Sequence, residues 1–241
     1  MLQQLFRNIP DVTKNLLIIN VLMFLATFLL EANDIYLRRE FAMFYFDNPL
    51  FEPFQVVTHF FMHGGFGHIF FNMFALVMFG SQLEKAWGPK RFLLFYFITA
   101  LGAAALHTGV NMLIVNDLVG TVSPFHDGII VDDHLLWQEL SKGQMDKLAA
   151  ALYSPVLGAS GAVYGLLLAF ALLWPNTELM LIFLPIPIKA KYFVPVLMIG
   201  ELYLGVNDFE WDNIAHFAHL GGALIGFILV MIWKRDRTKF Y

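Results

Sequence analysis

Residues 156–165 read VLGASGAVYG, and they place a serine among small residues in a chain that is otherwise strongly apolar. Ser160 stands where an apolar run begins, and Tyr164 follows about one helical turn later. Small residues in such a run allow membrane helices to pack closely, and a serine there often bonds only to its own backbone. Whether Ser160 does more depends on the polar residues that lie at the same depth elsewhere in the chain.

The composition is that of a membrane protein. Of the 241 residues, 59% are hydrophobic and only 14% are charged, and the mean hydropathy is +0.65. This is too little polar surface to cover a soluble globule of this size, so we predict an integral, multi-pass protein of the lipid bilayer. The net charge of −4, without a basic patch, argues against nucleic acid as a partner.

Six apolar runs approach or exceed the length of a helix that crosses the hydrocarbon core of a bilayer. They cover residues 16–31, 66–84, 92–114, 157–174, 191–206 and 213–233. Because a helix satisfies its own backbone groups in lipid, we predict an all-α membrane protein, a bundle of six transmembrane helices that forms a single domain over residues 1–241. Residues 1–15 are a short polar segment, and no small-residue cleavage site follows the first run, so we expect that run to be a retained helix.

The distribution of positive charge predicts the orientation of the bundle. With the N-terminus in the cytoplasm, eleven of the fifteen Lys and Arg residues lie on the cytoplasmic side. We therefore expect both termini to be cytoplasmic, in the plasma (inner) membrane if the organism is bacterial. The long connection of about 115–156 then lies outside, and the helical spacing of apolar residues over 132–153 predicts a surface helix within it.

Polar side chains inside a membrane are costly, so each is a candidate functional group. Three sets lie near the starts of the second, fourth and sixth runs: His68 with Asn72 on one helix face, then Ser160, then His216 with His219. With the N-terminus inside, these three helices run in the same direction, so their first turns share one level within roughly 10 Å of the outer boundary. This agreement predicts a shared cavity that water can reach.

These residue types fit nucleophilic catalysis. A serine hydroxyl becomes a nucleophile when a base takes its proton, and a histidine suits both that step and the protonation of a leaving amine. An asparagine, a second histidine and backbone N–H groups at the start of a helix can bind an oxyanion, and Gly158 allows a substrate close to that backbone. No Asp or Glu stands near the base in the sequence, which indicates a dyad and not a triad.

Two small-residue patterns predict how the serine and a histidine meet. Gly161 and Gly165 are four apart in the fourth run, and Gly222 and Gly226 are four apart in the sixth. This spacing puts each pair on one helix face and allows the two backbones to approach closely. Such a crossing would bring the serine and the second histidine of the sixth run into contact.

Together these motifs resemble those of the rhomboid intramembrane serine proteases. The shared pattern lies within about residues 51–233 and comprises Gly158-x-Ser160-Gly161, His219-x-x-Gly222-x-x-x-Gly226 and His68-x-x-x-Asn72. The resemblance implies a six-helix fold, with Ser160 as nucleophile and His219 as general base. It also implies that His68 and Asn72 bind the oxyanion together with the backbone amide of the serine. Tyr164 would pack against the base.

The resemblance further implies the reaction and its partners. In rhomboid proteases the substrate is a transmembrane helix of a single-pass or polytopic membrane protein, which enters past the fifth helix. It is cut near the outer membrane face through an acyl-enzyme, and no metal or cofactor takes part. The expected enzyme is therefore an intramembrane serine endopeptidase.

Other functions remain open from the sequence. A metal hydrolase or transporter could use His59, His63 and His68, although no HExxH motif, cysteine or carboxylate in the same segment supports such a site. A catalytically inactive rhomboid-like protein would bind membrane clients without cutting them, but such relatives typically lack the serine or the histidine. Glu201 is a carboxylate inside the fifth run, which we expect to hydrogen-bond a neighbouring helix and to influence lateral gating. The alternative is a structural acid that is satisfied locally or extends to the membrane surface.

Overall fold

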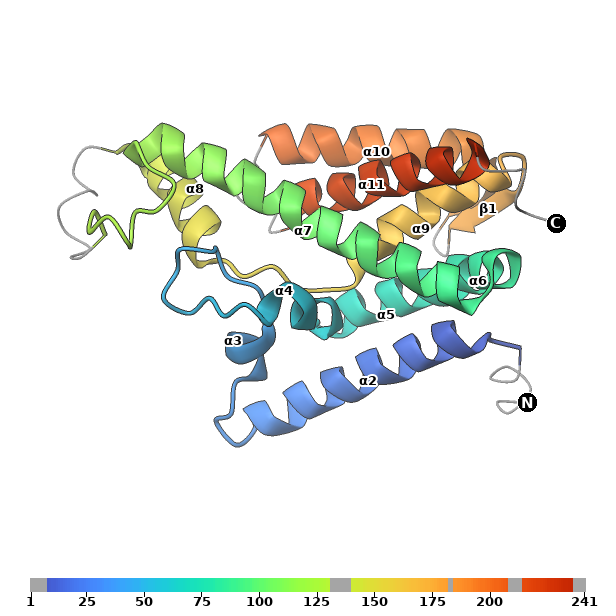
Figure 1. Cartoon of the computed structure of the whole chain (residues 1–241), viewed down its shortest axis with the longest axis horizontal. Helices are drawn as coiled ribbons and strands as arrows, with labels where there is room; N and C mark the ends of the chain where they lie inside the picture. Colours follow the sequence, from blue (N-terminus) through green and yellow to red (C-terminus); the bar gives the residue numbers. More distant parts are fainter. Residues whose placement is uncertain (1–7, 131–139, 182–183, 208–213, 236–241) are drawn as a thin grey trace.

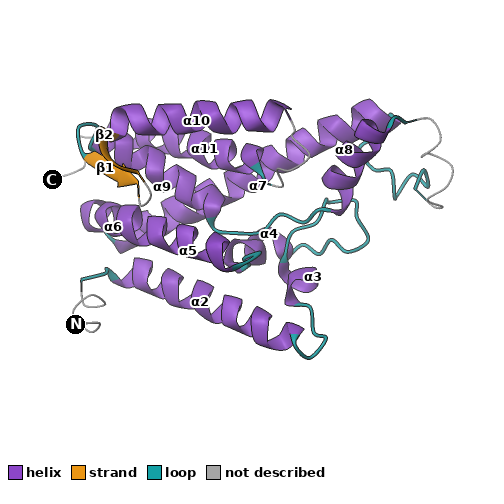
Figure 2. Ribbon diagram, turned by 180° about the vertical axis from the view of Figure 1, so that it is seen from behind, coloured by secondary structure: helices purple, strands orange, loops and turns teal. Residues whose placement is uncertain are grey.

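The computed structural model describes residues 8–130, 140–181, 184–207 and 214–235. Its elements in chain order are α2 (Asp11–Glu31), α3 (Leu37–Phe41), α4 (Gln55–Thr58), η1 (His59–Phe61), α5 (Phe66–Ala75), η2 (Leu76–Gly80), α6 (Ser81–Trp87), α7 (Pro89–Val119), α8 (Lys142–Tyr153), α9 (Ser160–Leu173), β1 (Glu178–Leu181), β2 (Leu184–Lys189), α10 (Ala190–Asn207) and α11 (His216–Arg235). The long helices form a bundle, and the two strands lie at one of its ends (Figure 1; Figure 2).

Six helical segments coincide with the six apolar runs: α2, α5 continued by η2 and α6, α7, α9, α10 and α11. Within the described residues, four are long and apolar enough to cross a membrane, namely Asp11–Glu31, Phe66–Trp87, Pro89–Val119 and His216–Lys234. α9 is apolar but has only 14 residues, and α10 carries Pro195 in its interior. The chain is thus a multi-pass helical membrane protein, while the full count of six spans stays a prediction.

α9 is the central helix of the bundle. Nine of its 14 residues are buried, because α7 and α11 pack against it. α5, α9 and α11 begin at a similar level along the bundle and run in the same direction, as the depth of their polar residues predicts (Figure 1). The start of α2 and the end of α11 both lie at the opposite end of the bundle (Figure 1). Which side of a membrane this end faces remains a prediction from the charge distribution.

α7 is longer than its apolar run, which ends at residue 114. The helix continues to Val119 and ends at Gly120, whose φ of 78° is left-handed and typical of a helix end. Packing supports the extra turn, because Val115 is fully buried in a second apolar cluster outside the main core. The other buried members of this cluster are Tyr45, Leu148, Ala151 and Leu152.

The long connection between α7 and α9 contains the predicted surface helix in part. α8 begins at a capping box, in which the side chains and backbones of Ser141 and Gln144 bond to each other. Its buried face packs on the end of α7. Residues 132–139, the first part of the predicted helix, lie outside the described residues.

One element departs from the all-α prediction. β1 and β2 form an antiparallel hairpin between α9 and α10, with Glu178 opposite Lys189. Pro185 and Pro187 of β2 disfavour a regular helix here, because proline supplies no backbone N–H. In a two-stranded sheet each strand has a free edge, where proline is tolerated.

Candidate active site

α9 and α11 cross in direct backbone contact. A Cβ atom added to Gly222 would lie 1.8 Å from the carbonyl oxygen of Gly161, and one added to Gly226 would lie 3.0 Å from the Cα of Gly165. Gly161 also faces α7, where a Cβ would lie 2.4 Å from that of Ala103. Larger residues do not fit at this crossing, so the glycines set the distance between the two helices.

The crossing brings Ser160 next to His219. Ser160 is the first residue of α9, and its Oγ lies 2.9 Å from His219 Nε2. The His219 ring is buried and stacks on the ring of Tyr164, with centroids 4.1 Å apart and 8° between the planes. The serine hydroxyl can therefore donate to an imidazole whose plane is held by an aromatic neighbour.

His68 and Asn72 of α5 converge on the backbone just before Ser160. Gly158 has a left-handed φ of 117°, and a Cβ there would lie 2.7 Å from His68 Nε2 and 3.6 Å from Asn72 Nδ2. Asn72 is 5% exposed, and within the described part of the chain its Nδ2 has no hydrogen-bond partner. The first N–H groups of a helix likewise have no acceptor in the helix itself. Buried donors of this kind, next to a nucleophile, suit the binding of an oxyanion.

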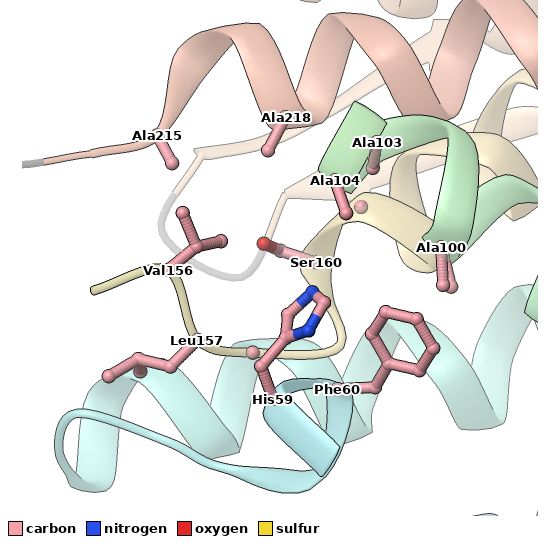
Figure 3. Close-up of a pocket in the computed structure, with 13 residues that line it drawn as sticks. His59, Phe60, Ala100, Ala103, Ala104, Val156, Leu157, Ser160, Ala215 and Ala218 are labelled. Carbon is pink, nitrogen blue, oxygen red and sulfur yellow. The ribbon is translucent and has the colours of Figure 1, made fainter. Parts of the chain in front are cut away.

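A small cavity borders the serine. Figure 3 shows the Ser160 hydroxyl directed into this space, near Val156, with the ring of His59 close by. Alanines of α7 and α11 form much of the remaining wall. The space open to a water-sized molecule is about 20 Å³, whereas one water needs roughly 10–15 Å³. One water molecule therefore fits beside the serine.

The structure also places a carboxylate at the histidine, where the sequence indicated none. Glu201 of α10 is 7% exposed, and its Oε2 lies 2.9 Å from His219 Nδ1 and 2.7 Å from His216 Nδ1. Its Oε1 accepts a hydrogen bond from the hydroxyl of Tyr164. Glu201 thus bonds to α9 and α11, as expected of an acid that bonds to neighbouring helices. The expectation that no carboxylate lies at the base is wrong.

This contact does not follow from the sequence pattern, because Glu201 and His219 are 18 positions apart. That interval includes a helix end and the next helix start, and no spacing rule links side chains across it. The available signal was that Glu201 is the single acid of an otherwise apolar run.

The three histidines of the metal site that the sequence left open, His59, His63 and His68, do not form a ligand cluster among the described residues. Among the described residues, the one group of ligand side chains with atoms close enough to hold an ion is Glu201 with His216 and His219. His59 instead uses Nδ1 for a backbone carbonyl four residues earlier, at 2.7 Å. Burial lowers the pKa of His59 to about 4 and that of His63 to about 3, so both rings are neutral at pH 7.

Comparison with known proteins agrees with the motifs. A family model described as the Rhomboid domain matches residues 50–235. "RHOMBOID-like protein 12, mitochondrial" of Arabidopsis thaliana is 30% identical over 186 residues, which are 77% of this chain and 48% of that protein. "Rhomboid protein 1, mitochondrial" of Saccharomyces cerevisiae is 27% identical over 173 residues, 71% of this chain and 39% of that protein.

A mammalian relative shows a similar degree of likeness. "Presenilin-associated rhomboid-like protein, mitochondrial" of Bos taurus is 27% identical over 211 residues, 82% of this chain and 45% of that protein. The chain spans less than half the length of each of these three relatives. Since the family model covers most of the chain, the resemblance in the motifs is confirmed, and the chain belongs to the rhomboid family.

Proposed function

We propose that this rhomboid chain is an intramembrane serine endopeptidase that cleaves transmembrane helices near the outer membrane face. The observation that carries the proposal is the 2.9 Å contact between Ser160 Oγ and His219 Nε2, across the crossing of α9 and α11. A serine that serves packing alone would bond its hydroxyl to its own helix backbone. Here the hydroxyl meets an imidazole nitrogen from another helix, which is the arrangement of an activated nucleophile.

Acylation begins when Ser160 Oγ attacks the scissile carbonyl carbon. As the Oγ–C bond forms, His219 Nε2 takes the hydroxyl proton and the carbonyl oxygen becomes an oxyanion. The side chains of His68 and Asn72 and the Ser160 N–H donate to this oxyanion. The peptide C–N bond then breaks, the imidazolium gives its proton to the leaving amine, and an acyl-enzyme remains.

Deacylation uses water in the same geometry. His219 takes a proton from the water, and the hydroxide adds to the acyl carbon. The ester bond breaks, the proton returns to Ser160 Oγ, and a carboxylic acid leaves. The cavity beside Ser160 has room for this water. No step requires a metal or a cofactor.

The substrates that fit this site are helices of single-pass or polytopic membrane proteins, which reach it through the lipid bilayer. α10 exposes large apolar side chains toward the surroundings, among them Val196, Ile199 and Val206. It carries Glu201 on the face that packs against α9 and α11. A substrate that enters past α10 would therefore meet the lipid-facing side chains of this helix first.

Only the names of its relatives indicate which cellular membrane contains the protein. The three relatives described above carry names that place them in mitochondria. None of these names supports the expectation of a bacterial plasma membrane.

The test compares covalent labelling of the serine in four proteins. The full chain, purified in detergent, is treated with a fluorescent fluorophosphonate, as are Ser160→Ala, His219→Ala and the control Ser81→Ala, which alters a buried serine of α6. We expect labelling of the wild type and of the control, and none of the other two variants. A folded wild type that stays unlabelled at high probe concentration would contradict the proposal and favour the inactive, client-binding alternative.

A further inference from the structure

We infer that Glu201 is a positioning residue that completes a Ser160–His219–Glu201 triad by holding the imidazole in the protonation state and orientation of a general base. The inference rests on the proposed function and goes beyond the two-residue site that the family resemblance implies. Three features carry it: the direction of the hydrogen bonds, the number of groups that fix the carboxylate, and its burial.

The hydrogen bonds admit one tautomer of the neutral ring. An ionised carboxylate only accepts hydrogen bonds, so the 2.9 Å contact with Glu201 Oε2 requires a proton on His219 Nδ1. A neutral ring protonated at Nδ1 has its lone pair on Nε2, the atom that lies 2.9 Å from Ser160 Oγ. This is the tautomer that can take the serine proton.

The carboxylate is itself fixed by donors from two helices. Tyr164 of α9 donates to Oε1 and also stacks on the His219 ring, and His216 of α11 lies 2.7 Å from Oε2 through Nδ1. Because each oxygen has a partner, Glu201 cannot rotate without losing at least one of these bonds. Stacking on Tyr164 therefore fixes the plane of the His219 ring, and the hydrogen bond to Glu201 fixes which ring nitrogen faces Ser160.

Burial makes the charge of Glu201 effective during the reaction. Glu201 is 7% exposed, so little water screens its charge. When His219 takes the serine proton it becomes an imidazolium, and the adjacent carboxylate stabilises this cation in the transition state. In this arrangement Glu201 acts on the reaction through its hydrogen bond to His219.

Glu201, His216 and His219 could instead hold a divalent cation, since their ligand atoms lie within 4.8 Å of one another. The two arrangements differ in protons. The hydrogen-bonded set needs a proton on both Nδ1 atoms, whereas a cation bound there would displace both. Treatment with a chelator therefore separates the triad from a metal site.

The experiment measures the fluorophosphonate labelling rate per folded molecule of the full chain in detergent. The variants are Glu201→Gln, Glu201→Asp and the matched control Glu84→Gln, which alters another buried carboxylate that does not touch a histidine. We expect Glu201→Gln to lower the rate by about 10²–10⁴-fold, since loss of the triad carboxylate in a serine protease costs up to ~10⁴. Glu201→Asp should restore part of the rate, and Glu84→Gln should match the wild type.

A spectroscopic measurement shows which nitrogen of His219 carries the proton, and it does not require an active enzyme. In protein labelled with ¹⁵N at histidine, the ring nitrogen shifts show whether Nδ1 or Nε2 carries the proton. We expect His219 of the wild type and of Ser160→Ala to be protonated at Nδ1, and Glu201→Gln to contain a substantial fraction protonated at Nε2. A purely structural role of Glu201 would leave the tautomer unchanged in every folded variant.

The outcomes separate this inference from the proposed function. If wild type and Ser160→Ala are both unlabelled, the protease proposal fails, and the ¹⁵N spectrum still tests what Glu201 does to His219. A wild-type ring protonated at Nε2, or a labelling rate in Glu201→Gln equal to that in Glu84→Gln, would overturn the inference. Loss of labelling on treatment with a chelator, restored by Zn²⁺, would overturn it in favour of a metal site.

Discussion

Two carboxylates buried in this bundle have the same chemistry and different neighbours. Glu84 of α6 is 4% exposed, and Glu201 of α10 is 7% exposed. Glu84 accepts from the backbone N–H groups of Val12 and Thr13 and from the Thr13 hydroxyl, at 2.7–2.9 Å. We call these residues the Glu84 cluster. The Glu201 cluster consists of Glu201, Tyr164, His216 and His219.

An acid buried between membrane helices is therefore not by itself the mark of a functional site. The donors around Glu84 are N–H groups at the start of α2, which a helix leaves without internal partners, and Glu84 satisfies them. It thereby fixes the beginning of α2 against α6. The donors around Glu201 include the imidazole proposed to take the serine proton. The partners, and not the burial, distinguish an anchor from a residue that positions a base.

The largest expected effect comes from separating the helices that carry the Glu201 cluster. Gly222→Ala adds a methyl group that would lie 1.8 Å from the Gly161 carbonyl oxygen, so α9 and α11 must move apart. We expect complete loss of fluorophosphonate labelling and a strongly reduced folded fraction in size-exclusion chromatography. Gly109→Ala is the matched control, because a Cβ on that α7 glycine meets no atom within 4 Å. Labelling of Gly222→Ala at the wild-type rate would contradict the proposed site.

The second-largest effect is expected from a substitution that removes an oxyanion donor and leaves the Glu84 and Glu201 clusters intact. For Asn72→Ala we expect kcat for cleavage of a transmembrane substrate to fall by about 10²–10³-fold, the usual cost of one such donor. The ¹⁵N spectrum of His219 should not change. Asn20→Ala serves as control, since Asn20 is buried in α2 and bonds there to the Leu16 carbonyl. Equal rates for the two variants would remove Asn72 from the proposed oxyanion site.

A smaller effect is expected from a change in the Glu84 cluster. Glu84→Gln replaces one carboxylate oxygen by an amide NH₂ group, which faces the N–H and O–H donors of Val12 and Thr13 and cannot accept from them. We expect this change to lower the free energy of unfolding by about 1–3 kcal/mol. Thermal unfolding in detergent measures this loss, while the labelling rate per folded molecule should stay at the wild-type value. A labelling defect as large as that of Glu201→Gln would erase the distinction between the two clusters.

The smallest effect is a pH dependence of stability that belongs to the loop before α5. His59 and His63 have pKa values of about 4 and about 3 in the folded chain, against 6.5 as the ordinary value. Below pH 6.5 the unfolded chain therefore binds more protons than the folded chain. The contribution of these neutral histidines to the free energy of unfolding is fully present above pH 6.5 and is lost as the pH decreases toward 4. Between pH 7 and 5.5 we expect a loss of about 1 kcal/mol for each histidine. His63→Leu should reduce this dependence in thermal unfolding, and an unchanged slope would contradict it.

Much of the fold followed from the sequence because lipid imposes simple rules. Apolar length and internal backbone bonding locate the long helices, and the structure has helices at all six apolar runs. The spacing of Gly161, Gly165, Gly222 and Gly226 predicted the close crossing that the structure contains. The extra turn of α7 was not predicted, since it depends on contacts with Tyr45 and α8 that are remote in sequence.

The amino-acid pattern alone predicts a helical membrane protein of the rhomboid type, with a serine, an asparagine and histidines at one depth. The contact of Glu201 with His219 depends instead on how the helices pack. A helix that is apolar on nearly all sides, such as α10, carries no amphipathic pattern that specifies its rotation about its own axis. That rotation is set by packing against α9 and α11, and it alone directs Glu201 toward the histidines and not toward lipid.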